Sequence, residues 1–399
     1  MYRVAPSRRH FILGATALVA SAAFGPAFGA KLSDFVDATW QTAKSRGVSR
    51  KTFETAMGGF KPLNSVLKLT GKQPEFVSTA ADYVGKRVDG AKAAQGQGMR
   101  AEWTQTLAAV SERYGVQPEI VLAIWGIETN FGGYMGSTNT VHGLATLAHA
   151  GYRADFFGQE LITALEILEA GHVKSKNMVG SWAGAMGHPQ FMPSSFMKYA
   201  VDFKGDGHKD IWGSIPDALA STANYLKSFG WRSGETWGYE VALPANFNYN
   251  NVWNDASAKL SDWSAIGVKR ANGKAFPRGD DVANLYMPMG GNGPVFAVLP
   301  NFGVIKRYNN SSSYALAVGH LADRILGSTG FVNAWPSDTG LTKAQRVELQ
   351  ARLGKRGYDL GTPDGVIGPK TRAALMDFQS RAGLTADGFP SGNALKALG

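Results

Sequence analysis

The spacing of apolar residues between positions 32 and 229 is the feature that most constrains the fold. In runs such as 103–110 and 160–168, apolar residues recur every three or four positions, which is the period of an amphipathic helix. The pattern therefore predicts a mainly α domain. The chain has 399 residues, which is too long for one ordinary domain, so we expect further parts.

A different pattern covers about 233–302. Pro, Gly and Asn become frequent there, and the short apolar runs 239–243 and 295–299 are typical of strands. Helical spacing returns at 312–325. We therefore predict one mainly α domain at 30–326 that carries a small strand-containing insertion at about 233–302.

The last part of the chain predicts a small helical domain at 342–399. Residues 327–341 contain Gly, Ser, Pro, Asp and Thr, which is typical of a linker. Amphipathic helices are predicted at 342–356 and 369–382, and a third, short helix at 391–398. With about 60 residues, this part is near the lower size limit for folding without disulfides.

The N-terminus predicts export. Three arginines precede an apolar stretch at 11–28 that is short and weakly hydrophobic for a membrane span. Small residues favour cleavage after Gly29, which makes 1–29 a signal peptide. Residues 7–13 resemble a twin-arginine signal, and a general secretory signal is the alternative. We expect a periplasmic protein without a transmembrane segment in its mature form.

Composition excludes several classes of function. The chain has no Cys, which excludes thiol catalysis, Cys-ligated zinc, disulfides and a lipid attached through Cys. Its net charge of +10 favours polyanions, among them nucleic acid, an anionic cell-wall polymer and lipid head groups. Because Lys and Arg are scattered, the charge argues against a nucleic-acid arm, and we expect no nucleic-acid partner.

Glu128 is the strongest candidate for chemistry. Pro118 suits a helix first turn, and Ile124 lies four residues before Glu128 on the apolar face. The sequence 129–133, with Asn and two glycines, should end the helix at once. Desolvation and the negative end of the helix dipole both favour a protonated carboxyl there, as a general acid requires. An ion-paired structural glutamate is the alternative.

Two segments resemble motifs of a single family. Residues 126–132 (GIETNFG) resemble the catalytic motif of the membrane-bound lytic transglycosylase B family, of the glycoside hydrolase family 103 type. Residues 180–195 (GSWAGAMGHPQFMPSS) resemble its signature loop almost residue for residue. The resemblance covers roughly 32–326 and implies a lysozyme-like fold with a groove for the glycan strands of peptidoglycan.

The resemblance implies a reaction that uses a single carboxylate. The family cleaves the β-1,4 bond between N-acetylmuramic acid and N-acetylglucosamine and forms 1,6-anhydro ends, with one glutamate, here Glu128, as acid and then base. Ordinary glycosidases need two carboxylates, and neither motif contains a second one. Glu160, Glu166 and Glu169 lie on an amphipathic helix, where we expect solvated rather than catalytic side chains.

Further site residues follow from the resemblance. The positions matched to sugar contacts, to a groove arginine or to the cleavage site are Ser181, Gln190, Phe191, Tyr225, Arg153, Tyr308, Asn309 and Tyr314, with Tyr83 as a further match. Core packing is the alternative role for each aromatic residue, because it is the commoner fate of Tyr and Phe.

The loop at 202–210 resembles the calcium loop of the family. Asp202 and Asp206 fit ligand positions, Gly207 fits the sharp turn, and Asp217 would complete the shell. Lys204 stands where an oxygen ligand is expected, and its ammonium would repel a cation. We therefore expect an ordered loop without metal and no other cofactor.

The C-terminal part resembles the small three-helix peptidoglycan-binding domain. Its matching segments are 349–353, 357–358, 364–371 and 374–379. A binding domain of this kind would raise the local concentration of enzyme on an insoluble polymer. The sequence leaves two alternatives open, namely a hydrolytic muramidase and a non-catalytic peptidoglycan-binding scaffold.

Overall fold

The computed structural model describes residues 31–70, 79–337 and 340–399, so the predicted signal peptide lies outside the described residues. Within this part of the chain, every helix is too short or too polar to cross a membrane. The chain forms two compact units. We call the described residues of 31–70 and 90–233 the helical unit, and residues 79–89 and 234–399 the mixed unit.

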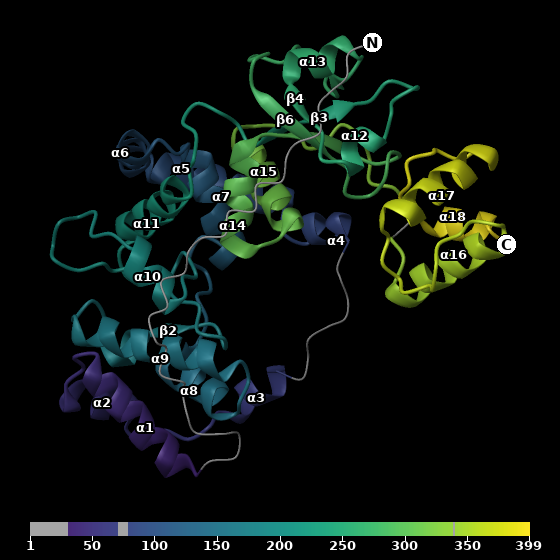
Figure 1. Cartoon of the computed structure of the whole chain (residues 1–399). Helices are drawn as coiled ribbons and strands as arrows, with labels where there is room; N and C mark the ends of the chain where they lie inside the picture. Colours follow the sequence, from purple (N-terminus) through teal and green to yellow (C-terminus); the bar gives the residue numbers. More distant parts are fainter. Residues whose placement is uncertain (1–30, 71–78, 338–339) are drawn as a thin grey trace. The chain divides into compact units, whose positions relative to one another are not determined.

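The helical unit is built around α7. Pro118 occupies the first turn of α7, where no N–H is needed, and seven consecutive residues from Ile120 to Gly126 are buried. Helices α5, α6 and α11 pack against it, while α8 packs along α9 (Figure 1). The helices and strands are α1 (Leu32–Ser45), α2 (Arg50–Met57), α3 (Asn64–Thr70), α5 (Gly90–Glu102), α6 (Thr104–Tyr114), α7 (Pro118–Thr129), β1 (Thr138–Asn139), α8 (Thr140–His149), α9 (Ala154–Glu169), β2 (Val179–Gly180), α10 (Pro193–Tyr199) and α11 (Ile215–Ser228).

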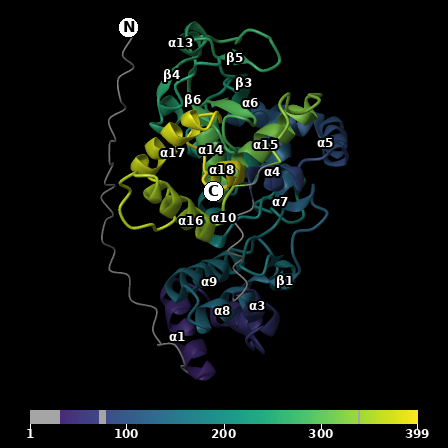
Figure 2. The same cartoon turned by 90° about the vertical axis from the view of Figure 1, so that its right-hand side faces the viewer.

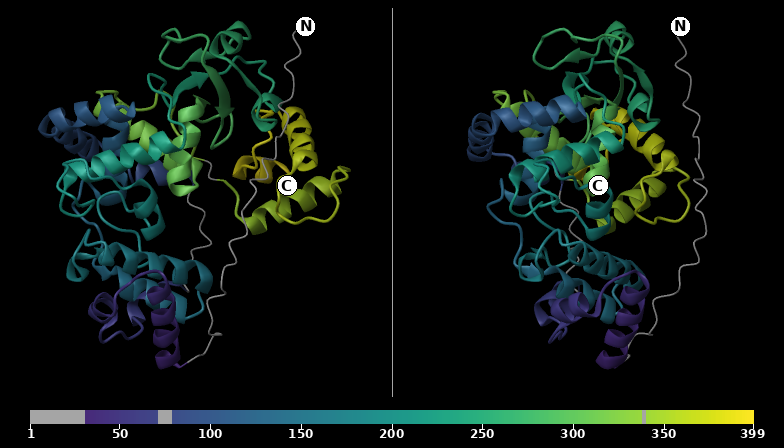
Figure 3. Two further views of the ribbon diagram at one scale, coloured as in Figure 1. Left: turned by 60° about the vertical axis from the view of Figure 1, so that its left-hand side comes forward. Right: turned by 90° about the vertical axis from the view of Figure 1, so that its left-hand side faces the viewer.

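The mixed unit contains an antiparallel sheet, drawn as green arrows in Figure 3. Its strand order is β4-β6-β7-β3-β5. Strands β3 and β7 pair with Tyr239 opposite Ala297, which confirms both predicted strands. Helix α15 packs on α4 and α14. The elements are α4 (Ala80–Gly85), β3 (Gly238–Ala242), α12 (Asn250–Trp253), β4 (Ser257–Lys259), α13 (Leu260–Ala265), β5 (Lys269–Arg270), β6 (Val282–Tyr286), β7 (Val295–Val298), α14 (Pro300–Asn309) and α15 (Ser312–Ile325).

The three predicted C-terminal helices are confirmed as α16 (Lys343–Lys355), α17 (Pro369–Arg381) and α18 (Gly392–Ala397), and they form one group in Figure 2. Thr342 caps α16 in a capping box with Gln345. A buried apolar cluster that includes Leu349, Leu375 and Phe378 holds the helices together.

A buried histidine in α15 makes the stability of the fold depend on pH. His320 is 6% exposed, and burial, together with the positive charge of Arg324, lowers its pKa to about 4. In the unfolded chain the ring has its ordinary value near 6.5. The folded state therefore holds a neutral ring, and the unfolded state gains a proton as the pH falls below about 6.5.

We predict that the free energy of unfolding decreases as the pH falls from 6.5 to about 4. The decrease should be smaller in His320→Gln than in the wild type. The ring accounts for at most about 3 kcal/mol of this decrease, because one pKa unit corresponds to about 1.4 kcal/mol. Urea unfolding at pH 7 and pH 4.5 measures the difference for both proteins. An equal decrease in both proteins would contradict the assignment to His320.

Candidate active site

Glu128 lies in the last turn of the buried helix α7 and is half-buried. The helix ends one residue later, as predicted, because Asn130 and Phe131 both adopt left-handed backbone conformations with φ of 52° and 56°. The N–H of Asn130 still bonds to the carbonyl of Gly126 at 3.1 Å. The carboxyl group of Glu128 therefore lies at the end of a buried, mostly apolar helix.

A histidine from the signature loop fastens the end of α7. The indole Nε1 of Trp125 donates to Nδ1 of His188 at 2.9 Å, and the Thr129 hydroxyl donates to the His188 carbonyl at 3.2 Å. Because an indole N–H can only donate, Nδ1 accepts, and the neutral ring carries its proton on Nε2. Burial lowers the pKa of His188, which keeps the ring neutral.

The signature loop at 180–195 is closed by its own polar groups. Strand β2 pairs with β1, and single bridges join Met186 to Gly180 and to Phe191. The Ser181 hydroxyl accepts from the N–H of Ala185 at 3.0 Å. Gln190, with φ of 51°, donates its amide to the carbonyls of Met135 and Gly187 at 3.2 and 2.8 Å. Ser181 and Gln190, which were predicted to contact sugar, therefore also maintain the conformation of the loop.

Glycine is required at two positions around Glu128. A Cβ atom on Gly126 would lie 2.6 Å from the ring of Phe131. A Cβ atom on Gly132, where φ is 82°, would lie 2.4 Å from Cε1 of His188. No carbon atom fits at these distances, so the motif 126–132 needs glycine for the backbone to pack against these two rings.

The other predicted residues of the helical unit have different surroundings. Phe191 is 2% exposed and Tyr225 is 8% exposed, with ring centroids 5.7 Å apart, so the structure brings them together in the core. Arg153 is exposed, and its guanidinium lies 4.3 Å from the ring of Phe156. Core packing, the alternative considered for the aromatic residues, describes most of the surface of Phe191 and Tyr225.

The remaining candidates belong to the mixed unit. Tyr308 at the end of α14 stacks on Tyr314 of α15, with centroids 6.2 Å apart and an interplanar angle of 10°. Tyr308 is half-buried, Tyr314 is 1% exposed and Asn309 is exposed. Tyr83 on α4 is half-buried below the guanidinium of Arg87, at 3.7 Å.

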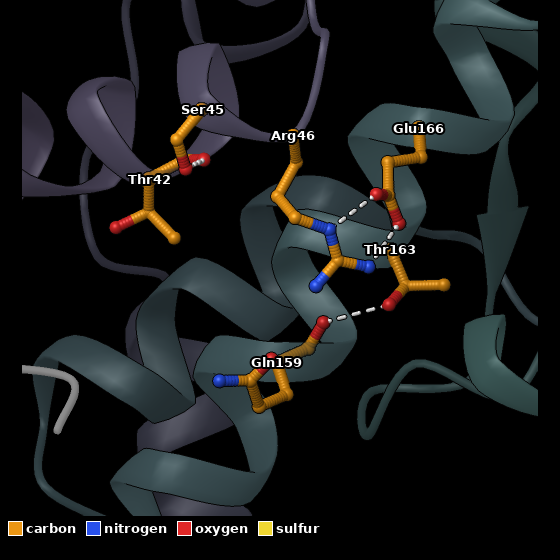
Figure 4. Close-up of polar contacts among 6 residues, drawn as sticks. All are labelled: Thr42, Ser45, Arg46, Gln159, Thr163 and Glu166. Carbon is orange, nitrogen blue, oxygen red and sulfur yellow. Dashed lines mark hydrogen bonds and ion pairs between the residues drawn. The ribbon is translucent and has the colours of Figure 1, made fainter. Parts of the chain in front are cut away.

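The acids of α9 hold the fold, and the prediction that they are solvated was wrong for Glu160. Its side chain is 4% exposed and accepts from the N–H and hydroxyl of Ser194 at 2.9 and 2.6 Å, which caps the first turn of α10. Glu166 pairs with Arg46 at 2.8 Å (Figure 4). Glu169 accepts from the N–H and hydroxyl of Ser49. Their partners lie far away in sequence, where helical periodicity cannot reveal them.

The loop resembling a calcium site is held by backbone hydrogen bonds. Asp202 accepts from the N–H groups of Gly205 and Gly207, each at 2.7 Å. Asp217, which is fully buried, accepts from the N–H groups of Phe203, Lys204 and Asp210. Within the described ranges, no group of three or more His, Asp or Glu side chains is placed to hold a metal ion. In this arrangement, carboxylate oxygens of Asp202 and Asp217 accept from N–H groups of their own loop.

Comparison with known proteins identifies the family. Residues 31–323 match the transglycosylase SLT domain family. The chain belongs to this family. Residues 342–398 match a peptidoglycan binding domain family. Membrane-bound lytic murein transglycosylase B of Escherichia coli (strain K12) is 33% identical over 305 residues, which are 73% of this chain and 81% of that protein.

Solved structures of the same family share the fold. SltB3 from Pseudomonas aeruginosa, in complex with NAG-anhNAM-pentapeptide, has 44% identity and a TM-score of 0.84 and covers 93% of this chain and 100% of that chain. An Escherichia coli lytic transglycosylase in complex with calcium has 32% identity and a TM-score of 0.61, over 74% of this chain and 92% of that chain. These relatives are lytic transglycosylases, and the chain is an enzyme of this kind with a lysozyme-like fold.

The sequence analysis missed the residues that hold Glu128 in place. His188 and Trp125 were both inside the recognised segments or next to them, but no spacing rule pairs positions 63 residues apart. Lys92 of α5 was also missed, and its ammonium donates to the carbonyl of Gly126 at 3.1 Å. The available signal was a polar ring placed between a glycine and a proline in the loop.

We predict that Gly132→Ala destabilises the protein by about 2–4 kcal/mol, because a left-handed alanine is strained and its Cβ displaces His188. Gly98→Ala is the matched control, since Gly98 is exposed in α5 with nothing within 4 Å of an added Cβ. That control should stabilise by about 0.5–1 kcal/mol. Urea unfolding measures both, and a wild-type midpoint for Gly132→Ala would refute the requirement for glycine.

Proposed function

We propose that the protein cleaves the β-1,4 bond between N-acetylmuramic acid and N-acetylglucosamine in peptidoglycan and leaves 1,6-anhydro-N-acetylmuramic acid ends. Glu128 is its single general acid and base. The observation that carries this proposal is the placement of Glu128, half-buried at the end of a helix that is otherwise buried. Family membership supports the substrate, because the related SltB3 was solved in complex with NAG-anhNAM-pentapeptide.

The acids of α9 support a mechanism with one carboxylate. Glu160, Glu166 and Glu169 are each bound to partners of the protein itself, which gives them structural roles. A hydrolase of the ordinary kind would need a second carboxyl group about 5–10 Å from the first. These three side chains are not available for that role.

The reaction proceeds in two proton transfers through Glu128. The carboxylic acid protonates the glycosidic oxygen while the bond from this oxygen to the anomeric carbon breaks. The resulting carboxylate then takes the proton of the muramoyl 6-hydroxyl, whose oxygen attacks the same anomeric carbon. The glutamate is protonated again at the end, and no water is consumed. Lys92 and His188 act as positioning residues, because they hold the last turn of α7.

The remaining candidates are proposed as substrate contacts. Ser181 and Gln190 are half-buried on a loop whose shape they maintain, so their free surface is rigidly presented to a sugar. Arg153 and Asn309 are exposed and polar, and Tyr83 and Tyr308 present half-buried rings. Phe191, Tyr225 and Tyr314 are buried and support the others. We propose a periplasmic location and export by the twin-arginine route, which fits this substrate.

We predict that Glu128→Gln lowers the rate of anhydro-muropeptide release from purified sacculi by about 10²–10⁴-fold, the usual contribution of general acid–base catalysis. Mass spectrometry of the released muropeptides measures this, because anhydro products are lighter than hydrolytic ones by one water. Glu112→Gln, at an exposed position of α6, is the matched control and should keep the wild-type rate.

Three outcomes would contradict the proposal, in whole or in part. Release of hydrated products by the wild type would make the protein a hydrolytic muramidase. Binding to sacculi without release of any product would make it a peptidoglycan-binding scaffold. If Glu128→Gln released anhydro products at an unchanged rate, the proposed reaction would stand but Glu128 would not be its acid and base.

We infer that the loop at 202–217 keeps its shape without calcium and that no cofactor takes part in the reaction. Backbone N–H groups donate hydrogen bonds to the carboxylate oxygens of Asp202 and Asp217. Lys204 supplies a positive charge at the position where the family has a ligand oxygen. The structural role of the metal is thereby taken by groups of the chain.

We predict that calcium chloride leaves the Tm of the wild type unchanged, whereas Lys204→Asp makes the Tm rise with calcium concentration. The variant gains an oxygen ligand, and a ligand present at about 100 times its Kd stabilises by about 2.7 kcal/mol. Differential scanning calorimetry with calcium and with a chelator measures both. A wild-type Tm that rises with calcium and falls with the chelator would contradict the inference.

A further inference from the structure

A cavity of about 520 Å³ lies in the mixed unit, and none of the candidate residues described above lines it. Its walls come from β3, from the turn after β5, from the end of α15 and from residues 326–332, which we call the strap. Cavities that bind drug-sized molecules usually have volumes of about 300–1,000 Å³. The volume therefore suits a ligand of a few amino-acid residues or one sugar.

The strap is held in place, so the cavity is a built feature of the fold. Both carboxylate oxygens of Glu240 accept hydrogen bonds at the end of the strap, from the N–H of Val332 at 2.6 Å and from the N–H of the next residue, Asn333, at 2.8 Å. Phe331 stacks on His320 with ring centroids 3.8 Å apart and contacts Phe296 at 5.0 Å. Part of the predicted linker thus forms a fixed wall.

Two acids and two cations line the cavity, and the cations have donors left for an anion. The acids Glu240 and Asp323 accept from N–H groups of the protein, in the case of Asp323 from the indole of Trp237 at 3.2 Å. The cations differ. Arg270 gives one described hydrogen bond, to the carbonyl of Ala275, and lies 4.8 Å over the ring of Tyr239. Among the described residues, no carboxylate pairs with the exposed Lys274. Donors of both cations are therefore left for a ligand.

The uncharged parts of the wall favour a peptide over a simple anion. Tyr239 and Phe331 offer apolar ring surface, and the strap brings main-chain groups of 326–332 to the cavity. An inorganic anion would use none of this surface. A short peptide with carboxylates uses all three kinds of group, because it has charged ends, amides and aliphatic side chains.

We propose that this cavity binds the carboxylate-bearing peptide stem of peptidoglycan, with Arg270 and Lys274 as its anion-binding residues. The proposal rests on the proposed function, since that polymer carries such peptides. A site of this kind gives the enzyme a hold on the peptide in addition to the glycan. It would therefore favour strands that carry peptides over naked glycan.

The test is calorimetric titration of the mature, full-length protein with a free stem peptide, alanyl-glutamyl-diaminopimelyl-alanine. We expect saturable binding that weakens about tenfold or more in Lys274→Gln and further in the double variant Arg270→Gln/Lys274→Gln, because each cation makes charge-assisted hydrogen bonds. Lys274 is exposed, so its substitution leaves the fold intact. The double variant Lys44→Gln/Lys51→Gln is the matched control, with the same change of charge at exposed positions of the helical unit.

Three results would overturn the proposal. They are no binding of the peptide, equal binding by Lys274→Gln and wild type, and equally tight binding of inorganic phosphate, which would make the cavity a general anion site. A second assay separates this proposal from the proposed function. If anhydro products form but the peptide does not bind, only the peptide site is wrong. If the peptide binds and sacculi give hydrated products, the reaction is wrong and the site stands.

Discussion

The hydrogen bond between Trp125 and His188 is the interaction on which the candidate site depends. It joins the last turn of α7 to the signature loop, two segments that lie 63 residues apart in sequence. Because an indole N–H in an apolar interior needs an acceptor, the bond also fixes which nitrogen of His188 is unprotonated. The Thr129 hydroxyl adds a second link through the His188 carbonyl. Glu128 sits between these two anchored residues, so its position is set from both sides.

This arrangement explains why so much of the motif is glycine. Two rings, Phe131 and His188, pack directly against the backbone at Gly126 and Gly132, and no side chain fits between them. Burial of α7 on all sides supplies the rigidity, since three helices surround it. A catalytic group on such a helix loses little precision to motion, which is what general acid–base chemistry requires. The two glycines are thus a packing requirement that fixes the backbone around Glu128.

Sequence reasoning found the helices and strands of the fold, and failed where the partners of a side chain lie far away in sequence. Apolar spacing located α7, α15 and the C-terminal helices, because local periodicity reports which face is buried. Glu160 was misjudged as solvated, because its partner Ser194 lies on another helix. For the same reason, the sequence analysis missed the partners of His188 and the role of Glu240, which binds a segment that was predicted to be a linker. A pattern within one element cannot show which distant element satisfies its polar groups.

The C-terminal helices are also attached by polar groups whose partners lie far away in sequence. Asp387 is 4% exposed, and its carboxylate accepts from Gln379 within the helical group and from the N–H of Gly291 near the sheet, at 2.9 and 2.7 Å. Its carbonyl accepts from the indole of Trp253 at 2.6 Å. The guanidinium of Arg372 covers the same indole at 3.6 Å. One buried aspartate therefore joins the small domain to the sheet. A peptidoglycan-binding domain fixed in this way favours polymer strands that reach the domain and the rest of the mixed unit at the same time. A flexibly tethered domain would bind strands in many more orientations.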